Sequence, residues 1–303
     1  MQTESTRNTS SGGAQSAYGQ NRIAFSTDVD SDISQAMQLY LISDLGIDPA
    51  AAAQRSAIEV DRIIPKSVIS QLESHGVLIE DRRVLDLGAG LGGLSEELLL
   101  CGAKLFSLEP GEAWALLTKR RLERHSRAFE LLHSGGESIP LPNNSVDLII
   151  SLQVLEHVRD PAKVLSEAFR VLRPGGHFLL ACENYLAFWE PHYKIMWFPL
   201  LPKPIGSLYL RLRGRSPKFL NEAITYTTLP TVLRVVRRLG FIRLRDEEIN
   251  QNLRAKPGMK WALLRAVSRF LGAPFVRLVD DAGGYFKVGI HELLRKPEDV
   301  ERV

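Results

Sequence analysis

A glycine-rich turn between a predicted strand and a predicted helix is the feature that most restricts the fold of this 303-residue chain. The run Arg83–Leu87 predicts a buried strand, and Gly88, Gly90 and Gly93 follow it before a helical pattern begins. Glycines in such a turn let the backbone approach a ligand closely, and the helix N-terminus offers free N–H groups to an anion. The spacing also fits the dinucleotide-binding pattern G-x-G-x-x-G, so the turn alone does not exclude a nicotinamide-dependent dehydrogenase.

Short apolar runs alternate with longer amphipathic runs over the middle of the chain, which predicts βαβ units and a mostly parallel sheet. Helices are expected at Ser95–Leu100, Pro161–Leu172 and Thr228–Leu239. The run Arg173–Gly176 is expected to close the second of them. Strands are expected at Arg83–Leu87, Lys104–Leu108, Phe129–Leu132, Val146–Ser151, His177–Ala181, Phe241–Ile249 and Tyr285–Leu293.

Three helices are predicted ahead of the sheet. The first runs from Ile33, the second begins at Pro49 and is expected to be broken by Pro65, and the third ends at Gly76. Residues 1–22 are mostly small and polar and cannot bury enough apolar area to offset their ordering entropy. We therefore expect a disordered tail there.

The composition indicates a globular chain that can bury a sizeable core, since 45% of its residues are hydrophobic. No apolar run approaches the roughly 18 residues that cross a bilayer, and the N-terminus lacks a signal-peptide pattern, so we expect a cytoplasmic location. Cys101 and Cys182 lie far apart and beside no histidine pair. They indicate neither a disulfide framework nor a zinc site.

Positive charge is concentrated in the C-terminal half of the chain. Residues 190–277 hold 17 Lys or Arg and five Asp or Glu, whereas the whole chain has a net charge of +3. Such asymmetry indicates an anionic partner, whether phosphate, nucleic acid or a membrane surface. Two stretches, Tyr193–Leu220 and Lys260–Leu271, mix apolar and basic residues as interfacial sequences do. Their apolar residues could equally form the core of a cap, and both interpretations stay open.

Six short motifs follow one another between Val84 and Glu183. They are Asp86 two residues ahead of the glycine turn, Glu109-Pro110, Gly136–Pro142, Val146–Ser151, Leu155–Val158 and Leu172–Gly176. Each motif is common by itself. In this order and at this spacing they resemble the class I S-adenosylmethionine-dependent methyltransferases of the UbiE, or ubiquinone-methylase (Methyltransferase type 11), family.

The resemblance implies an α/β, Rossmann-like class I methyltransferase fold, with a mostly parallel seven-stranded sheet, helices on both faces and helical cap insertions. The last two predicted strands would form that fold's reversed hairpin, which a dehydrogenase would not need. The implied organisation is a disordered tail at 1–22, an N-terminal helical cap at 23–66, a cofactor-binding core at 67–183, an acceptor-side cap insertion at 184–227, and the C-terminal part of the core at 228–303 with a helical insertion at about 250–283.

The same resemblance implies S-adenosyl-L-methionine as the cofactor. Its methionine end would lie on the loop that holds Gly88 and Gly90, with Asp86 near that loop. Leu152 and Gln153 would pass beneath the methionine end.

The nucleoside end of the cofactor would lie along the next two strands. Glu109 would accept hydrogen bonds from the ribose hydroxyls, although an acid at this place could also serve only a helix N-terminus. Gly136 and Glu137 would edge the adenine. Gly135 stands where the family often has an aspartate toward the adenine amino group, so that contact is missing or is supplied by Glu137.

The pair Glu156-His157 has two interpretations. In some relatives a Glu-x-x-Glu-His pattern on this turn binds a divalent metal, but Gln153 stands at the first position here, so no metal is expected. His157 is a candidate catalytic base because imidazole titrates near neutral pH, although the pair could instead only cap and orient the loop. His192 is a second candidate, since its segment leaves the fifth strand at the edge where open α/β sheets bind ligands.

The acceptor is expected beside the segment after the fifth strand, where Tyr185, Trp189, His192 and Tyr193 are candidate substrate contacts. This segment resembles a bacterial methyltransferase subgroup associated with surface glycan and glycolipid assembly. That resemblance implies an O-methyltransferase acting on a sugar, glycolipid or other lipid-linked acceptor, with peripheral contact to the inner face of a membrane through the basic cap. An RNA or small-molecule methyltransferase and a non-catalytic cofactor-binding subunit stay open, although no appended RNA-binding motif is evident in the sequence.

Overall fold

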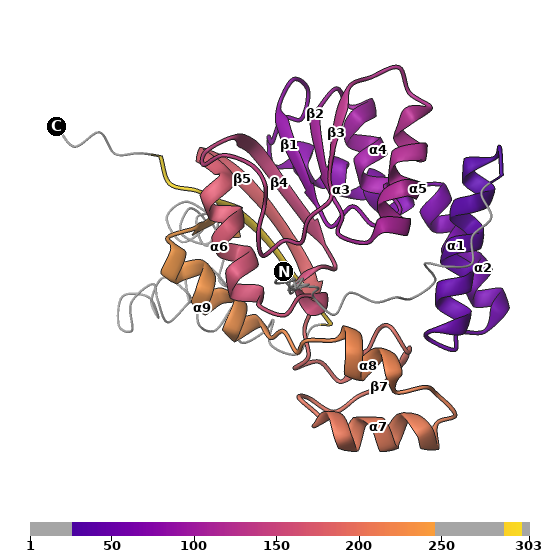
Figure 1. The fold of residues 1–303 in the computed structure, drawn as a ribbon. Coiled ribbons are helices and arrows are strands. Elements are labelled where there is room, and N and C mark those ends of the chain that lie inside the picture. Colours follow the sequence, from indigo (N-terminus) through magenta and orange to yellow (C-terminus); the bar gives the residue numbers. More distant parts are fainter. Residues whose placement is uncertain (1–25, 246–287, 299–303) are drawn as a thin grey trace, which may run out of the picture.

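The computed structural model describes residues 26–245 and 288–298, and its centre is a twisted seven-stranded sheet with helices on both faces (Figure 1). The strand order is β3-β2-β1-β4-β5-β9-β8. The strands are β1 Arg83–Leu87, β2 Lys104–Leu108, β3 Phe129–Leu132, β4 Val146–Leu152, β5 Leu172–Glu183, β8 Ile242–Arg243 and β9 Gly289–Arg295.

The first five strands run parallel, and the last two form the reversed hairpin that the sequence predicts. β1 pairs in parallel with β2 and β4, whereas β9 is antiparallel to both β5 and β8. The carboxyl ends of β1 to β5 therefore meet at one edge of the sheet, where ligands bind in this architecture. The predicted Rossmann-like α/β class is confirmed.

Several strand boundaries differ from the prediction. β4 and β5 extend to Leu152 and Glu183, and β9 ends at Arg295 rather than Leu293. β5 begins at Leu172 rather than His177, because Leu172 pairs with Val146 before the register shifts and His177 pairs with Leu148. The Arg173–Gly176 run therefore bulges within a strand instead of closing the preceding helix. Within the described residues β8 is only two residues long, because the chain turns helical directly after it.

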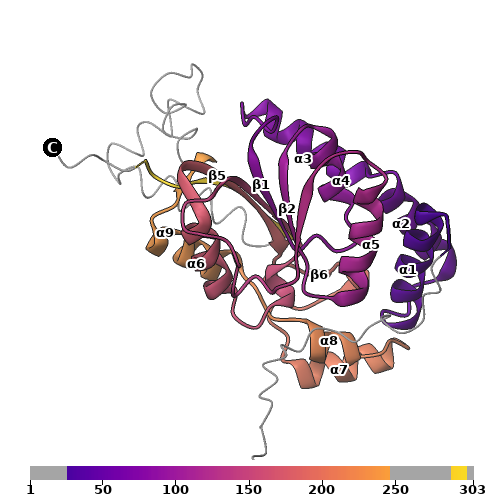
Figure 2. The same ribbon diagram turned by 45° about the horizontal axis from the view of Figure 1, so that its top comes forward.

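Helices cover the two faces of the sheet as separate layers (Figures 1 and 2). One face packs on α3, α4 and α5, and the other packs on α6 and α9. Successive strand residues alternate between the layers, as Leu148 and Ile150 face the first and Ile149 faces the second. The bounds are α3 Ile63–Ser74, α4 Gly93–Leu100, α5 Glu112–Glu123, α6 Pro161–Val171 and α9 Leu229–Leu239.

The helices ahead of the sheet begin with α1 (Val29–Ser43) and α2 (Pro49–Val60). The prediction that Pro65 breaks a helix is wrong. The break comes at Arg62, which has a left-handed backbone, and Pro65 lies in the first turn of α3. A proline is tolerated there because N–H groups of the first turn have no partner within the helix.

Residues 184–227, which we call the acceptor-side layer, form a small unit at the carboxyl edge of the sheet (Figure 1). A hairpin of β6 (Trp189–Glu190) and β7 (Ile195–Met196) precedes α7 (Lys203–Leu212) and α8 (Lys218–Ala223). The core of this layer is shared with α1 and includes Leu41, Tyr193, Trp197, Leu210 and Phe219. Prolines and aromatics concealed α7 and α8 in the sequence pattern.

Within the described ranges, no helix combines the length and the apolar character that crossing a bilayer requires. The expected tail at 1–22 and the basic stretch Lys260–Leu271 lie outside the described residues.

Candidate active site

The glycine turn after β1 lies at the carboxyl edge of the sheet and has the backbone geometry that only glycine adopts easily. Gly88 and Gly90 have φ values of 87° and 56°. The N–H groups of Gly88 and Ala89 each donate to the Leu108 carbonyl at 2.9 Å, which fixes the turn to β2. A Cβ on Gly88 would collide with the Val154 side chain, whereas one on Gly90 would meet open space. The predicted loop thus presents free space at Gly90.

Glu109 links this loop to the next one. One of its carboxylate oxygens accepts from the Gly90 N–H at 2.9 Å, and the other accepts from the Gly111 N–H at 2.8 Å. The side chain is buried, and burial raises its pKa. Each carboxylate oxygen has a second lone pair, so the group can still accept from a ligand hydroxyl beside Gly90.

Asp86 lies beneath the loop rather than on it. Its carboxyl accepts from the Ser95 hydroxyl at 2.6 Å, and burial raises its pKa to about 7. The contact ties the strand to the first turn of α4. Thr118 of α5, which the sequence did not single out, donates to the Gly90 carbonyl at 2.7 Å and holds the loop from the other side.

The loop after β3 carries the two residues predicted to edge the adenine. Gly136 is buried against Leu87 and Val164, and a Cβ there would lie 3.2 Å from the nearest Val164 atom. Glu137 accepts from the Arg159 N–H at 3.1 Å and so joins this loop to the one after β4. The two residues border the same edge of the sheet as Glu109.

The end of β4 is a strained turn. Leu152 is the last residue of the strand, and Gln153 follows it with φ at 57° while its N–H donates to the Ala181 carbonyl at 2.8 Å. A left-handed non-glycine residue costs about 1 kcal/mol or more and tends to occur at functional sites. The Ser151 hydroxyl is buried here and has no hydrogen-bond partner in the described structure.

Two carboxyl groups lie together beside this turn. Glu156 belongs to the 3-10 turn η1 (Leu155–His157), and Glu183 is the last residue of β5. With its amide nitrogen turned toward them, Gln153 donates to Glu183 at 2.9 Å and also to Glu156. Burial raises the pKa of Glu156 to about 8 and that of Glu183 to about 7. One oxygen of each carboxyl is buried without a hydrogen-bond partner in the described structure.

The two predicted catalytic histidines meet above these carboxyls, with ring centroids 5.3 Å apart. His157 donates from Nδ1 to the Ala223 carbonyl at 2.9 Å, and burial lowers its pKa to about 4. His192 places Nδ1 2.8 Å from Glu190 Oε1. Burial acts to lower the pKa of His192, but Glu190 with the neighbouring carboxyls outweighs it and raises that pKa. His157 is therefore neutral, while the carboxyl groups around His192 make its ring more basic.

Glu190 was missed by the sequence interpretation. It is 1% exposed, and it also accepts from the Tyr193 N–H at 2.6 Å. Glu183 was missed as well, because the predicted fifth strand stops at Ala181. An acid two residues beyond a predicted parallel strand was the available signal, since ligands bind at that edge.

Glu156, His157 and His192 could hold a metal ion, since each offers a ligand atom and these atoms lie within 4.8 Å of one another. The sequence predicts no metal because Gln153 replaces an acid, and that expectation stays a prediction. The fold adds His192 to the pair, which the sequence could not place there.

The other predicted acceptor contacts divide into two groups. Tyr185 and Tyr193 are buried in the acceptor-side layer, and the Tyr193 hydroxyl donates to the Ser216 carbonyl at 2.8 Å. Tyr185 stacks on Tyr226 with centroids 4.7 Å apart. Trp189 is 44% exposed on β6. Their role in acceptor binding stays a prediction, and the Tyr185 hydroxyl joins His192 at the carboxyl groups by donating to Glu190 Oε1 at 3.4 Å.

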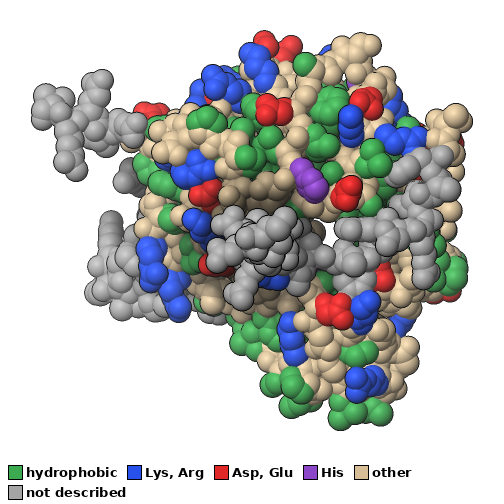
Figure 3. Space-filling model, viewed as in Figure 1, with side chains coloured by type: hydrophobic (Ala, Val, Ile, Leu, Met, Phe, Trp, Pro, Cys, Tyr) green, Lys and Arg blue, Asp and Glu red, His purple; other side chains and the backbone are tan. Residues whose placement is uncertain are grey.

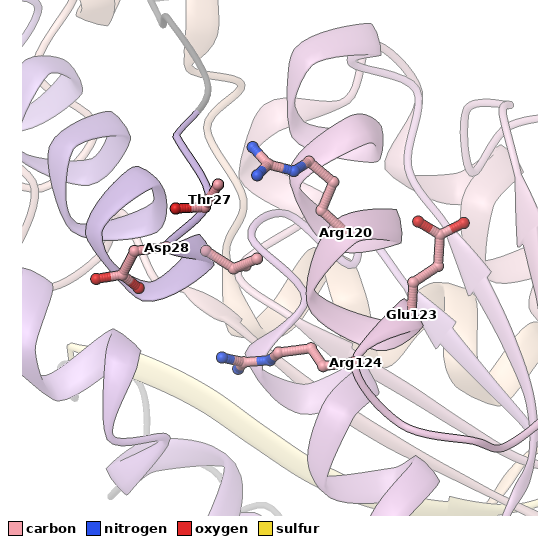
Figure 4. A pocket seen from close by; sticks show the side chains of 6 residues that line it. Thr27, Asp28, Arg120, Glu123 and Arg124 are labelled. Carbon is pink, nitrogen blue, oxygen red and sulfur yellow. The ribbon is translucent and has the colours of Figure 1, made fainter.

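A surface cavity of about 430 Å³ lies elsewhere, between the start of α1 and the last turns of α5 (Figure 4). Arg120 and Arg124 line it, but each is already paired with an aspartate of α1 at 2.8 Å or less. Thr118 of α5 contacts the glycine loop, whereas Arg120 and Arg124 bond the start of α1 and face this cavity. We therefore place the candidate site at the strand edge.

The fold and the site define a class I, Rossmann-like domain whose glycine loop lies at the sheet edge where such domains bind their cofactor. Residues 85–180 match the profile of the family described as methyltransferase domain. The chain is 36% identical over 107 residues to a Mycolicibacterium smegmatis protein named as an S-adenosylmethionine-dependent methyltransferase. Over these residues the chain is thus similar to the UbiE-like class I methyltransferases, whose cofactor is S-adenosylmethionine.

The similarity covers the methyltransferase domain rather than the full length of these relatives. The M. smegmatis match covers 35% of this chain and 40% of that protein. A ubiquinone biosynthesis O-methyltransferase of Parvibaculum lavamentivorans is 29% identical, over 40% of this chain and 50% of its own length. A solved structure from Galdieria sulphuraria, named for sarcosine dimethylglycine methyltransferase, covers 83% of this chain and 89% of its own at 17% identity with a TM-score of 0.50. At that identity it shows the fold alone.

Proposed function

We propose that this chain transfers the methyl group of S-adenosylmethionine to a hydroxyl oxygen of a lipid-linked acceptor. The observation that carries the proposal is the His192–Glu190 pair, which stands over Glu156 and Glu183 at the ends of β4 and β5. A hydroxyl becomes a good nucleophile when a base accepts its proton, and this pair supplies a base with a fixed ring.

The residues present fit the cofactor. Gly90 leaves space where a side chain would stand, and Glu109 is fixed beside that space with lone pairs for ribose hydroxyls. The unpartnered Ser151 hydroxyl lies at the end of β4, where the methionine end is expected. When bound there, the cofactor supplies an activated methyl group on a sulfonium.

The chain's own side chains would then orient the acceptor and move its proton. Glu190 holds His192 through Nδ1, which leaves Nε2 to accept the hydroxyl proton. Glu190 is itself held by the Tyr193 N–H, so the ring cannot turn freely. Alignment of nucleophile and methyl group supplies much of the acceleration in such a reaction. His157, neutral and bonded to Ala223, closes the other side of the cluster.

The lipid-linked acceptor rests on two supports. Two relatives are named as ubiquinone biosynthesis O-methyltransferase and demethylmenaquinone methyltransferase, and neither is named for a sugar. The acceptor-side layer that carries His192 also exposes many apolar side chains. A lipid-linked quinone-type ring and a lipid-linked sugar share the same chemistry at the site, namely a hydroxyl on a head group.

Cofactor binding is the first test. S-adenosylmethionine or its demethylated product should raise the melting temperature, because a ligand that binds only the native state stabilises it. NAD should give no comparable rise in a thermal-shift assay. Stabilisation by NAD in place of the methionine cofactor would contradict the proposed activity.

Methyl transfer is the second test. Purified enzyme with radiolabelled cofactor should label extracted bacterial lipids, and saponification with head-group analysis would distinguish a sugar from a phenolic ring. His192→Ala should lower the rate by about 100-fold or more, as loss of a general base does. His75→Ala, at an exposed helix end, is the matched control and should be as active as wild type. Labelling confined to RNA or to water-soluble small molecules would refute the lipid-linked acceptor.

A further inference from the structure

We infer that the outer surface of the acceptor-side layer docks on an anionic lipid bilayer. Fifteen large hydrophobic side chains are exposed in the described part of the chain, and eight of them fall between residues 188 and 212. This concentration is far above the scattered exposure normal for a monomer. The eight, which we call the outer apolar surface, are Phe188, Trp189, Met196, Phe198, Leu200, Ile205, Leu208 and Leu212.

The extended segment around β7 sorts its side chains with a period of two. Ile195 and Trp197 point into the core of the layer, while Met196, Phe198 and Leu200 are 59%, 52% and 46% exposed. Alternation of this kind puts polar residues outside in an ordinary protein. Here the side chains on both sides of the segment are apolar, which indicates that the outer side also contacts an apolar environment.

α7 repeats the same arrangement with a helical period. Its inner side consists of Gly206, Ser207 and Leu210, where small residues let the helix approach Trp197 closely. Its outer side carries Ile205, Leu208 and Leu212, which are 55%, 57% and 78% exposed. A three- or four-residue spacing places these three on one stripe.

The strand and helix contributions join into one surface. Trp189 pairs with Met196 across the hairpin, and the Tyr209 hydroxyl of α7 donates to the Met196 carbonyl at 3.1 Å. The hairpin and the helix therefore lie side by side. Figure 3 shows hydrophobic side chains gathered along the edge of the molecule that α7 forms, with Lys and Arg among them.

Charge identifies the occupant of this surface. Residues 184–227 hold six Lys or Arg and only two acids, and one of these acids, Glu190, is buried. Lys194, Arg211 and Arg213 are exposed beside the outer apolar surface. Apolar side chains fringed by cations match the interface of a bilayer that contains acidic lipids, where each nearby Lys or Arg adds roughly 1 kcal/mol.

The surface also belongs to the same layer as the candidate base. His192 lies in the turn of the β6–β7 hairpin, which carries Trp189 and Met196 of the outer apolar surface. Docking would hold this hairpin at the headgroup level, where a lipid-linked acceptor presents its hydroxyl. This consequence rests on the proposed function, whereas the docking itself does not.

Trp197 does not belong to the outer apolar surface. The sequence assigned it to an interfacial stretch, but its side chain is 1% exposed and packs against α7. Trp197 is therefore part of the layer's core, and its substitution would unfold the layer rather than test the surface.

Vesicle co-sedimentation tests the inference without any measurement of catalysis. Wild type should sediment with vesicles of phosphatidylcholine and phosphatidylglycerol, bind pure phosphatidylcholine less, and be released as salt is raised. I205S/L208S/L212S should lower the partition coefficient by at least about tenfold, because three apolar anchors are lost. The matched control I63S/I64S/L78S removes three side chains of similar exposure from outside the layer and should bind as wild type does.

Other outcomes would overturn the inference. Equal vesicle binding by wild type and the outer-surface variant would show that another region docks. A wild type that ignores vesicles but forms a dimer lost in the same variant would identify a second copy of the chain as the occupant. If the triple variant fails to fold by circular dichroism, R211E/R213E, which alters only exposed charge, should still lose binding to the acidic vesicles, and its unchanged binding would refute the docking.

Discussion

At the residue scale, Glu109 is the side chain on which cofactor affinity should depend most. Its carboxylate lies beside the open space at Gly90 and is already fixed by two backbone N–H groups. Glu109→Ala should weaken S-adenosylmethionine binding by about 1.5 to 3 kcal/mol, the usual value for charge-assisted hydrogen bonds. Isothermal titration calorimetry measures the change. Glu112→Ala, one turn away at the start of α5, is the matched control, and equal affinity in both variants would place the ribose elsewhere.

A second residue-scale prediction concerns metal. Chelation with EDTA should leave methyl transfer largely intact, because Gln153 supplies an amide where metal-binding relatives carry an acid, and its amide group already bridges Glu156 and Glu183. Activity that is abolished by EDTA and restored by a divalent cation would contradict this expectation. It would then identify Glu156, His157 and His192 as the ligands.

Side chains within one motif could be predicted from the sequence, and side chains that meet only in the fold could not. The glycine turn and Glu109 lie in short, ordered motifs, so their place at the sheet edge followed from strand positions alone. Thr118, Glu183 and Glu190 come from α5, β5 and β6, which converge only after packing. Tyr193, predicted as an acceptor contact, is fully buried in the core of the acceptor-side layer, and its contact with the acceptor stays a prediction.

At the element scale, the periodic elements of the core were predictable and the small layer was not. β1, β2 and β3 begin and end where the apolar runs predict. α7 escaped detection because the prolines at its start, Pro202 and Pro204, are typical of a chain break as well as of a first helical turn.

Arg121 should hold the helices ahead of the sheet onto the core. It is 0% exposed and bonds Glu96 of α4 at 2.8 Å and Glu59 of α2 at 2.9 Å. Arg121→Met should lower the free energy of unfolding by about 1 to 3 kcal/mol, because the carbonyls of Leu91, Glu59 and Val60 lose their buried donor, whereas Glu96 keeps Arg62 and Arg124 as partners. Urea denaturation measures this loss. Lys119→Met on the same helix removes an exposed pair and should cost less than about 1 kcal/mol. Equal effects would show that the buried network adds no more than a surface pair.

At the scale of the whole molecule, one edge of the sheet concentrates the groups whose ionisation folding suppresses. Asp86 and Glu183 have pKa values raised to about 7, and Glu156 has one raised to about 8, with burial as the first cause in each case. His192 differs from these acids, since its raised pKa means that Glu190 and the neighbouring carboxyls favour its charged form. Strongly shifted pKa values are typical of functional sites, so these shifts favour a ligand-binding role for this edge of the sheet.

The pH dependence of stability follows from these shifts. Above about pH 6.5 the unfolded chain has lost the protons of the three carboxyls and is losing that of His192, whereas the folded chain keeps a larger share of all four. The unfolded state then binds fewer protons, so the free energy of unfolding must fall as pH rises toward 8. Below pH 6.5 the lowered pKa of His157 acts in the opposite direction, because the unfolded chain takes up a proton that the folded ring refuses.

Urea denaturation of the ligand-free protein at pH 6.5, 7.5 and 8.5 measures the expected slope. One fully suppressed group contributes about 1.4 kcal/mol per pH unit, so a loss of at least about 1 kcal/mol is expected between pH 6.5 and 7.5. Glu156→Gln should flatten the profile, because the Glu156 carboxyl keeps its proton in the folded protein up to about pH 8 and loses it on unfolding. Glu80→Gln, at a surface carboxylate, should leave the slope unchanged. A free energy of unfolding that is constant or rises over this range would show that Glu156 and Glu183 are ionised in the folded protein, and the neutral carboxyl cluster beneath His192 would have to be abandoned.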